Sequence, residues 1–196
     1  MSMTSVTHCT LALDGTSAAR CLHHRPVGHT LPAVDDAAIE GAVRKAAERT
    51  GLGYEIVPCD PTLADTADFC AAYGYSMEDS ANCVLVIGKA EVPVYAACVV
   101  LATTRLDVNG TVRRRLGTRK ASFAPAGDVV AATGMAIGGV TPLALPEGLP
   151  LWVDARVMDR DRIILGAGSR NAKVLAPPSI LTILGAEVVP DLAKPV

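Results

Sequence analysis

Apolar and polar residues alternate along the chain in short blocks, and the spacing within each block predicts a helix or a strand. Apolar residues recur at helical spacing after Asp35 and Asp36 up to Arg49, which predicts a first helix with an acidic cap. The β-branched run at 82–88 predicts a buried strand, and the run at 95–101 predicts its hairpin partner. Other blocks predict helices at 65–74, 107–117, 128–132 and 177–184, strands at 54–57, 151–154, 162–166, 173–175 and 186–189, and an extended segment at 119–124.

Short helices mixed with strands indicate the α+β class, as a curved mixed β-sheet or barrel with peripheral helices. Residues 1–34 have no clear period beyond a short strand predicted at 9–13, and we interpret them as an irregular N-terminal extension. Residues 35–196 are then one domain. The chain of 196 residues is 50% hydrophobic, which is sufficient for one sizeable core.

Composition and charge limit the classes of function that the protein can have. The net charge of -2 gives no general attraction to nucleic acid, so RNA binding requires a local basic patch. No apolar run approaches the ~20 residues of a membrane span, and the first residues lack a secretion signal, so we expect a cytoplasmic protein that does not contact the membrane. The six cysteines form no C-x-x-C pair, which predicts buried, reduced thiols and no zinc site.

The histidines are confined to one end of the chain. All four lie within the first 29 residues: His8, His23, His24 and His29. The main body is therefore predicted to work without a histidine-based catalytic triad or a histidine metal ligand. Its chemistry must use carboxylates, lysines, hydroxyls, backbone groups or the substrate itself.

Two glycine-rich segments are the candidate binding loops. In the first, 133–142, Gly134 ends a helix, a glycine pair leaves the main chain bare, and a proline fixes the exit. The second, 166–170, follows a predicted strand. If the two loops face each other across a hollow, their main-chain N–H groups form a pocket. Tight turns without any ligand explain both segments as well.

Several charged residues have two interpretations each. The basic cluster of Arg113, Arg114 and Arg115 with Arg119 and Lys120 is either a solvated surface or a phosphate contact. Asp154 follows the single tryptophan at the end of a strand, where it either serves a site or caps a turn. The acidic pair Asp65 and Asp68 is explained by helix capping and the helix dipole.

The order of segments from the strand at Asn82 to Val189 resembles the YbaK/EbsC family, the prolyl-tRNA synthetase-associated editing domain, and more loosely the resemblance covers about 38–192. The resemblance rests on Gly138-x-x-x-Pro142 after Thr133-Gly134, on Leu116-Gly117-Thr118-Arg119-Lys120, on Val153-Asp154, on Gly166-Ala167-Gly168-Ser169-Arg170 before Leu175-Ala176-Pro177, and on Leu184-Gly185-Ala186-Glu187-Val188-Val189.

The resemblance implies an aminoacyl-tRNA deacylase. Such domains hydrolyse the ester that joins a wrong amino acid to the terminal ribose of tRNA, with no cofactor and no metal. The partners implied are the 3′ end of a charged tRNA and an aminoacyl-tRNA synthetase. In the family, the glycine loop lies at the ester, a lysine early in the central strand holds the terminal nucleotide, and the ribose hydroxyl of the substrate assists attack by water.

The resemblance also implies roles for individual residues. Gly138, Gly139 and Thr141 would hold the ester carbonyl through backbone donors, and Asn82 would orient the ribose or the amino acid. Substrate-binding positions would be Pro142, Gly168, Ser169, Arg170, Arg119, Lys120 and Asp154.

The sequence departs from the family at one position, where Asn82 replaces the lysine. Asparagine forms hydrogen bonds but supplies no positive charge. Lys89 is an odd number of residues away along the strand and would point to the other face. Lys120 is the better substitute, provided that its segment folds over the pocket.

Three functions are therefore carried forward. The first is the editing hydrolase. The second is a binding module of the same fold that holds an aminoacyl or nucleotide-like ligand, or a synthetase, without turnover. The third is an interaction protein whose residues 1–34 form a homodimer contact, which light scattering with and without those residues would test.

Overall fold

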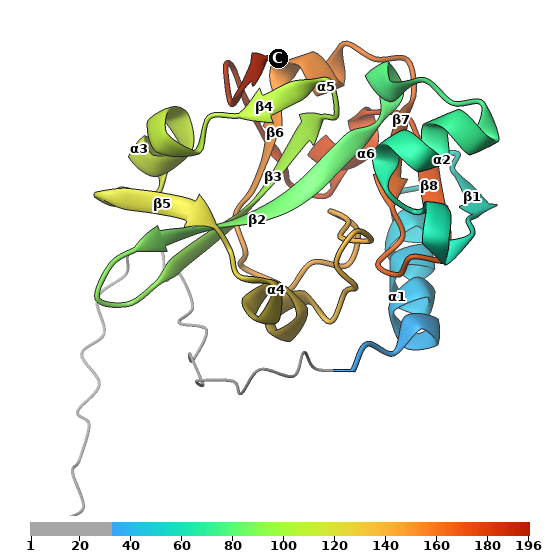
Figure 1. Cartoon of the computed structure of the whole chain (residues 1–196), viewed down its shortest axis with the longest axis horizontal. Helices are drawn as coiled ribbons and strands as arrows, with labels where there is room; N and C mark the ends of the chain where they lie inside the picture. The colour runs from blue at the N-terminus through green and yellow to red at the C-terminus, as the bar shows by residue number, and fades with distance from the viewer. Residues whose placement is uncertain (1–32) are drawn as a thin grey trace, which may run out of the picture.

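The structure is a computed structural model that describes residues 33–196. The strand predicted at 9–13 and the four histidines lie outside these residues, as does nearly all of the predicted N-terminal extension. The described chain forms a mixed α+β fold with several sheets (Figure 1). The predicted class is thus confirmed, and of its two variants the structure has open sheets, because no closed barrel forms among the described strands.

The main sheet has five strands in the order β5-β2-β3-β6-β9. The predicted hairpin is confirmed, since β2 pairs antiparallel with β3 over its length. The β5 strand pairs antiparallel with β2, whereas β6 is parallel to β3 and β9 is parallel to β6. The strands are β2 (Ala81–Lys89), β3 (Val94–Leu101), β5 (Lys120–Phe123), β6 (Leu151–Asp154) and β9 (Glu187–Val189).

A second, antiparallel sheet has the order β1-β8-β7 and is joined to the first by a bridge between Ser80 and Ile164. The inner strand predicted at 173–175 is confirmed as the middle strand of this sheet. A small third sheet pairs β10 with β4, and the sequence pattern did not predict either of these two strands. The bounds are β1 (Glu55–Pro58), β7 (Ile163–Gly166), β8 (Ala172–Ala176), β4 (Thr104–Leu106) and β10 (Ala193–Pro195).

The helices are short, and local signals explain their ends. Asp35 caps α1, because its side chain accepts a 3.0 Å hydrogen bond from the N–H of Ala38. Gly74 and Gly134 end α2 and α4 in the left-handed conformation, as predicted. The helices are α1 (Asp36–Arg49), α2 (Thr66–Tyr73), α3 (Arg113–Arg115), α4 (Ala126–Thr133), α5 (Ala155–Met158) and α6 (Ser179–Ile183), with single turns η1 (Pro61–Leu63), η2 (Met77–Asp79) and η3 (Val108–Val112).

Only part of the helix predicted at 107–117 is an α-helix. It begins as the π-helical turn η3, where the carboxylate of Asp107 accepts a 2.9 Å hydrogen bond from the N–H of Thr111, and continues as α3. The short helix α5 was not predicted at all. The four described cysteines are buried free thiols, as expected.

Aliphatic residues form the main core, which includes residues of both larger sheets and takes in Val43, Ala46 and Ala47 of α1. Strand β8 separates two clusters: Val174 faces this main core, whereas Leu175 packs with Phe69 and Ile164 in a smaller one. Since side chains alternate along a strand, Lys173 shares the face of Leu175. Figure 1 shows β2 running from the side of α2 and β7 to the side of β5 and α3.

Candidate active site

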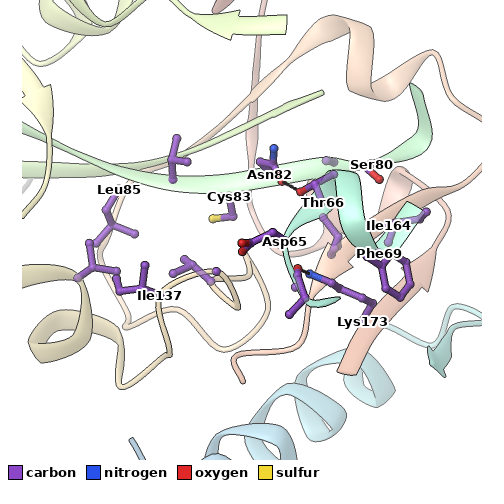
Figure 2. A pocket seen from close by; sticks show the side chains of 18 of the residues that line it. Asp65, Thr66, Phe69, Ser80, Asn82, Cys83, Leu85, Ile137, Ile164 and Lys173 are labelled. Atoms are coloured by element: carbon purple, nitrogen blue, oxygen red, sulfur yellow. Dashed lines mark hydrogen bonds between the residues drawn. The ribbon is translucent and has the colours of Figure 1, made fainter. Parts of the chain in front are cut away.

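A cavity of about 320 Å³ lies where β2, the start of α2, the β7–β8 pair and the 137–140 loop meet. Asn82 from β2 and Gly138 from the glycine loop both line it. Figure 2 shows polar side chains, among them Thr66 and Lys173, toward one side of the cavity, and Leu85 and Ile137 toward the other. The volume is at the small end of the range for ligand pockets.

Three consecutive residues before and at the start of α2 connect the elements around the cavity. The carbonyl oxygen of Ala64 accepts a hydrogen bond of 2.6 Å from Nζ of Lys173 on β8. Asp65 accepts one of 3.0 Å from the guanidinium of Arg170. The hydroxyl of Thr66 donates one of 3.0 Å to Oδ1 of Asn82 (Figure 2). Residues 64–66 are thereby joined to β8, to the 166–170 loop and to β2, the elements around the cavity.

Asp65 shows how the cap prediction must be refined. It occupies the N-cap position of α2, as predicted, but its side chain makes no capping hydrogen bond. The carboxylate pairs with Arg170 instead. Arg170 also donates a hydrogen bond of 3.0 Å to the carbonyl oxygen of Pro61, so its guanidinium is held by both Asp65 and Pro61.

The two glycine loops are joined directly rather than facing each other across a hollow. The N–H of Ala136 donates a hydrogen bond of 2.8 Å to the carbonyl of Gly168. The N–H of Gly168 donates one of 2.7 Å to the carbonyl of Gly139. The N–H of Gly139 donates 2.9 Å within its own loop to Ala136. The expectation that Gly139 and Gly168 present free N–H groups to a ligand is therefore wrong. The cavity opens beside the joined loops, with Gly138 in its wall.

Glycine is required at both positions of the pair. A Cβ on residue 139 would overlap the carbonyl group of Ser169, which explains how the loops approach so closely. Residue 138 has a φ of +86°, and a Cβ there would overlap the guanidinium of Arg170. The first contact fixes the fold of the loops, and the second places a charged side chain over the loop.

Four further predicted positions do not line the cavity. Thr141 is fully buried, and its N–H is 3.4 Å from the sulfur of Met135, so it does not offer the predicted donor. Pro142 is buried beside it. The hydroxyl of Ser169 accepts a hydrogen bond of 3.1 Å from the N–H of Asn171 and donates one to the carboxylate of Glu40. The bond to Glu40 anchors this loop to α1. Arg170 lies over Gly138, next to the cavity rather than in its wall.

Asp154 does not serve the site. It is 1% exposed and caps α5 through a 3.0 Å hydrogen bond from the N–H of Arg156. Its other oxygen accepts 2.8 Å from the N–H of Ala193. Of the two interpretations from sequence, the structural cap is the observed one.

Lys120 does not fold over the cavity. It is exposed on β5 and lies opposite Lys89 in the β2–β5 register, at the far end of β2 from Asn82. Phe123 of the same strand reaches the cavity, but neither Lys120 nor Arg119 does. Neither Lys89 nor Lys120 therefore replaces the missing lysine in the cavity.

Lys173 is the residue that sequence reasoning missed. It is 7% exposed, lines the cavity, and lies 5.6 Å from the centre of the Phe69 ring. Burial lowers the pKa of its ammonium below the ordinary value. The signal in the sequence is a lysine inside an otherwise apolar strand, and the strand pattern alone does not assign that lysine to a site.

Two other kinds of chemistry can be assessed at the cavity. Cys83 lines it, but burial raises the pKa of this thiol strongly, so it stays protonated and is a poor nucleophile. Within residues 33–196, no three His, Cys, Asp or Glu side chains come together as a cluster that could hold a metal ion.

An α+β domain whose ligand-sized cavity carries amide, hydroxyl and ammonium groups has a site suited to a small polar ligand. The chain belongs to the aminoacyl-tRNA editing domain family, whose sequence profile matches residues 60–181. The resemblance found from the sequence is thereby confirmed. Among the described residues, no helix is both long and apolar enough to cross a membrane.

Solved structures agree with this fold. The hypothetical protein APE2540 is 28% identical with a TM-score of 0.70, and the match covers 78% of this chain and 99% of that one. A candidate trans-editing enzyme for prolyl-tRNA synthetase is 24% identical with a TM-score of 0.69, and the match covers 81% of this chain and 98% of the other. The second likeness supports the fold.

Proposed function

We propose that the protein is an aminoacyl-tRNA deacylase that hydrolyses the ester of a mischarged tRNA in the cavity beside Asn82 and Gly138. The observation that carries this proposal is that these two residues, far apart in the sequence of an editing-family chain, line one cavity. Its volume suits an aminoacyl group and a sugar, whereas the rest of a tRNA would remain outside.

The cavity offers donors for the ester. No hydrogen bond among residues 33–196 is donated by the main-chain N–H of Gly138, which leaves it available to a carbonyl oxygen. The hydroxyl of Thr66 occupies Oδ1 of Asn82, so the amide nitrogen of Asn82 remains as a donor for the substrate. Water adds to the ester carbon, the bond to the ribose oxygen breaks, and that oxygen leaves with a proton. The ribose hydroxyl of the substrate assists the water.

The experiment is hydrolysis of a panel of mischarged tRNAs by the full chain. We expect at least one member to lose its amino acid faster than in buffer, with the correctly charged form of the same tRNA spared. If every member of the panel survives at the buffer rate, the proposed deacylase activity is wrong.

A second candidate is a binding module without turnover. It is favoured by one observation, namely that Asn82 stands at the position of the family lysine, so β2 supplies no positive charge to the cavity. Equilibrium binding of a charged tRNA, or of a synthetase, with no release of amino acid would support this candidate over the first.

We also propose that the basic surface of Arg119 and Lys120 contacts tRNA phosphates outside the cavity. Lys120 and Lys89 are cross-strand neighbours, an arrangement that costs stability unless an anion lies between them. Neither has a carboxylate partner among the described ion pairs. Lys120→Glu should raise KM and reduce its salt dependence, whereas Lys45→Glu on the exposed face of α1 should change neither. Equal effects of the two substitutions would contradict this surface.

A further inference from the structure

Lys173 occupies a position where packing alone favours an apolar residue. It is in the middle strand of its sheet, opposite Val57 on β1 and Gly166 on β7. Its face of β8 packs with Phe69 and Leu175 in a small hydrophobic cluster. An ammonium in such a place is costly unless it is paired, and Lys173 has no carboxylate within ion-pair distance among the described residues.

The donors of Lys173 are only partly used. An ammonium has three N–H donors, and one of them is taken by the carbonyl oxygen of Ala64 at 2.6 Å. The ring of Phe69, 5.6 Å away, adds a weaker attraction on another side. At least one donor is therefore left for a ligand in the cavity that Lys173 lines. Figure 2 shows Lys173 on the Phe69 side of the cavity.

The other cations near the site do not compete for this role. Arg170 is held by Asp65 and by the carbonyl of Pro61, outside the cavity wall. Of the described residues in the wall, Lys173 is the one with a cationic side chain. The segment that fixes Lys173 through Ala64 also fixes Asn82 through Thr66, so both groups are positioned by the same turn of chain.

We propose that Lys173 is a catalytic residue whose ammonium binds the carbonyl oxygen of the ester and stabilises the charge that develops there. The inference rests on the proposed deacylase function. As the oxygen of water bonds to the ester carbon, the π electron pair of the carbonyl moves onto its oxygen, beside Nζ of Lys173. When that pair returns, the bond to the ribose oxygen breaks, and the ribose oxygen receives the proton released by the water. Lys173 remains protonated throughout.

The test compares Lys173→Met with Lys45→Met, an exposed lysine on α1, in the full chain. For a tRNA that the wild type deacylates, Lys173→Met should lower kcat by about 10²- to 10³-fold. Its melting temperature should equal or exceed that of the wild type, because a buried charge that has no carboxylate partner is replaced by an apolar chain of similar length. Lys45→Met should change neither quantity. A folded Lys173→Met protein with wild-type kcat would overturn the role of Lys173 and leave the deacylase function standing.

A double variant covers the case in which Lys173→Met loses activity together with stability. Asn82→Lys in the Lys173→Met background returns an ammonium to the same cavity from β2. Recovery of at least about tenfold in kcat over Lys173→Met supports the role of the charge, and no recovery overturns it. A wild type that deacylates no member of the panel overturns the proposed function and this inference with it.

Discussion

The guanidinium of Arg170 lies against Gly138 in the space that a Cβ would fill. Arg170 is held there by Asp65 at 3.0 Å, one residue before α2 begins. The glycine loop, the loop after β7 and the start of α2 are thus fixed together beside the cavity. Residue 138 is glycine for two separable reasons, its positive φ and this contact.

Gly138→Ala should therefore harm the site more than the fold. The matched control is Gly134→Ala, which also has a positive φ, +69°, but has open space around its Cβ position. The control should lose about 1–2 kcal/mol in free energy of unfolding and keep its activity. Gly138→Ala must also displace Arg170, so we expect deacylation to fall by up to about 10²-fold. Adding Arg170→Ala to Gly138→Ala should relieve the overlap between the new Cβ and the guanidinium. Equal activity of Gly138→Ala and Gly134→Ala would contradict this account.

Cys83 should not act as a nucleophile, although its side chain lines the cavity. Burial raises the pKa of the Cys83 thiol, and raises that of Cys98 on the neighbouring strand to about 12. Cys83→Ala and Cys98→Ala should each lose about 1–2 kcal/mol of stability while deacylation stays within about twofold of the wild type. Loss of hydrolysis in the first variant alone, at a temperature where both are folded, would show that the thiol participates.

Asp154 should matter for stability and not for hydrolysis. Its removal leaves the N–H of Ala193 without its acceptor and takes the buried carboxylate away from the guanidinium of Arg156, which keeps the carbonyl of Ala193 and Asp191 as acceptors. Asp154→Ala should cost about 1–3 kcal/mol in urea unfolding, because a buried N–H loses its acceptor, with unchanged kcat per folded molecule. Asp191→Ala removes the exposed second partner of Arg156 and should have little effect. A stable Asp154→Ala protein with reduced kcat would restore the role predicted from sequence.

The stability difference between Lys173→Met and the wild type should depend on pH. The folded protein lowers the pKa of Lys173 below its ordinary value of 10.5, so between the two values the unfolded chain binds a proton that the folded chain does not. Wild-type stability therefore rises with pH through this window. The advantage of Lys173→Met should be largest below the lowered pKa and should shrink as pH approaches 10.5.

Groups that face Lys173 also titrate or carry charge, namely Cys59, Cys70, Asp65 and Arg170. They are present in both proteins, so the difference between the two unfolding curves isolates the lysine. Chemical unfolding at a series of pH values measures it. A difference that grows as pH rises would mean that the folded state favours the charged form of Lys173.

Local signals in the sequence predicted the parts of the fold that depend on neighbours along the chain. The cap at Asp35, the helix ends at Gly74 and Gly134 and the β2–β3 hairpin all follow from such signals. The contact between the two glycine loops could not be predicted in this way. It depends on the absence of a Cβ at Gly139 relative to Ser169, about thirty residues away, and only the docking of the strands brings these residues together.

The same limit explains the missed lysine. Alternation along β8 places Lys173 and Val174 on opposite faces, but the sequence does not reveal that a cavity, and not the core, lies on the face of Lys173. Alternation along the strand directs Lys89 to the other face, which left Lys120 as the better substitute if its segment folded over the pocket. The structure places it at the other end of β2, where it faces Lys89.

Filling the cavity tests the central claim most directly. Ala124 lines the cavity and is partly buried, whereas Ala121 is three residues earlier and does not line it. Single-turnover deacylation of the best mischarged tRNA should be measured for Ala124→Phe and Ala121→Phe, with circular dichroism to verify folding. We predict that Ala124→Phe abolishes hydrolysis and that Ala121→Phe retains it. Hydrolysis at the wild-type rate by a folded Ala124→Phe protein would show that the ester is cleaved elsewhere.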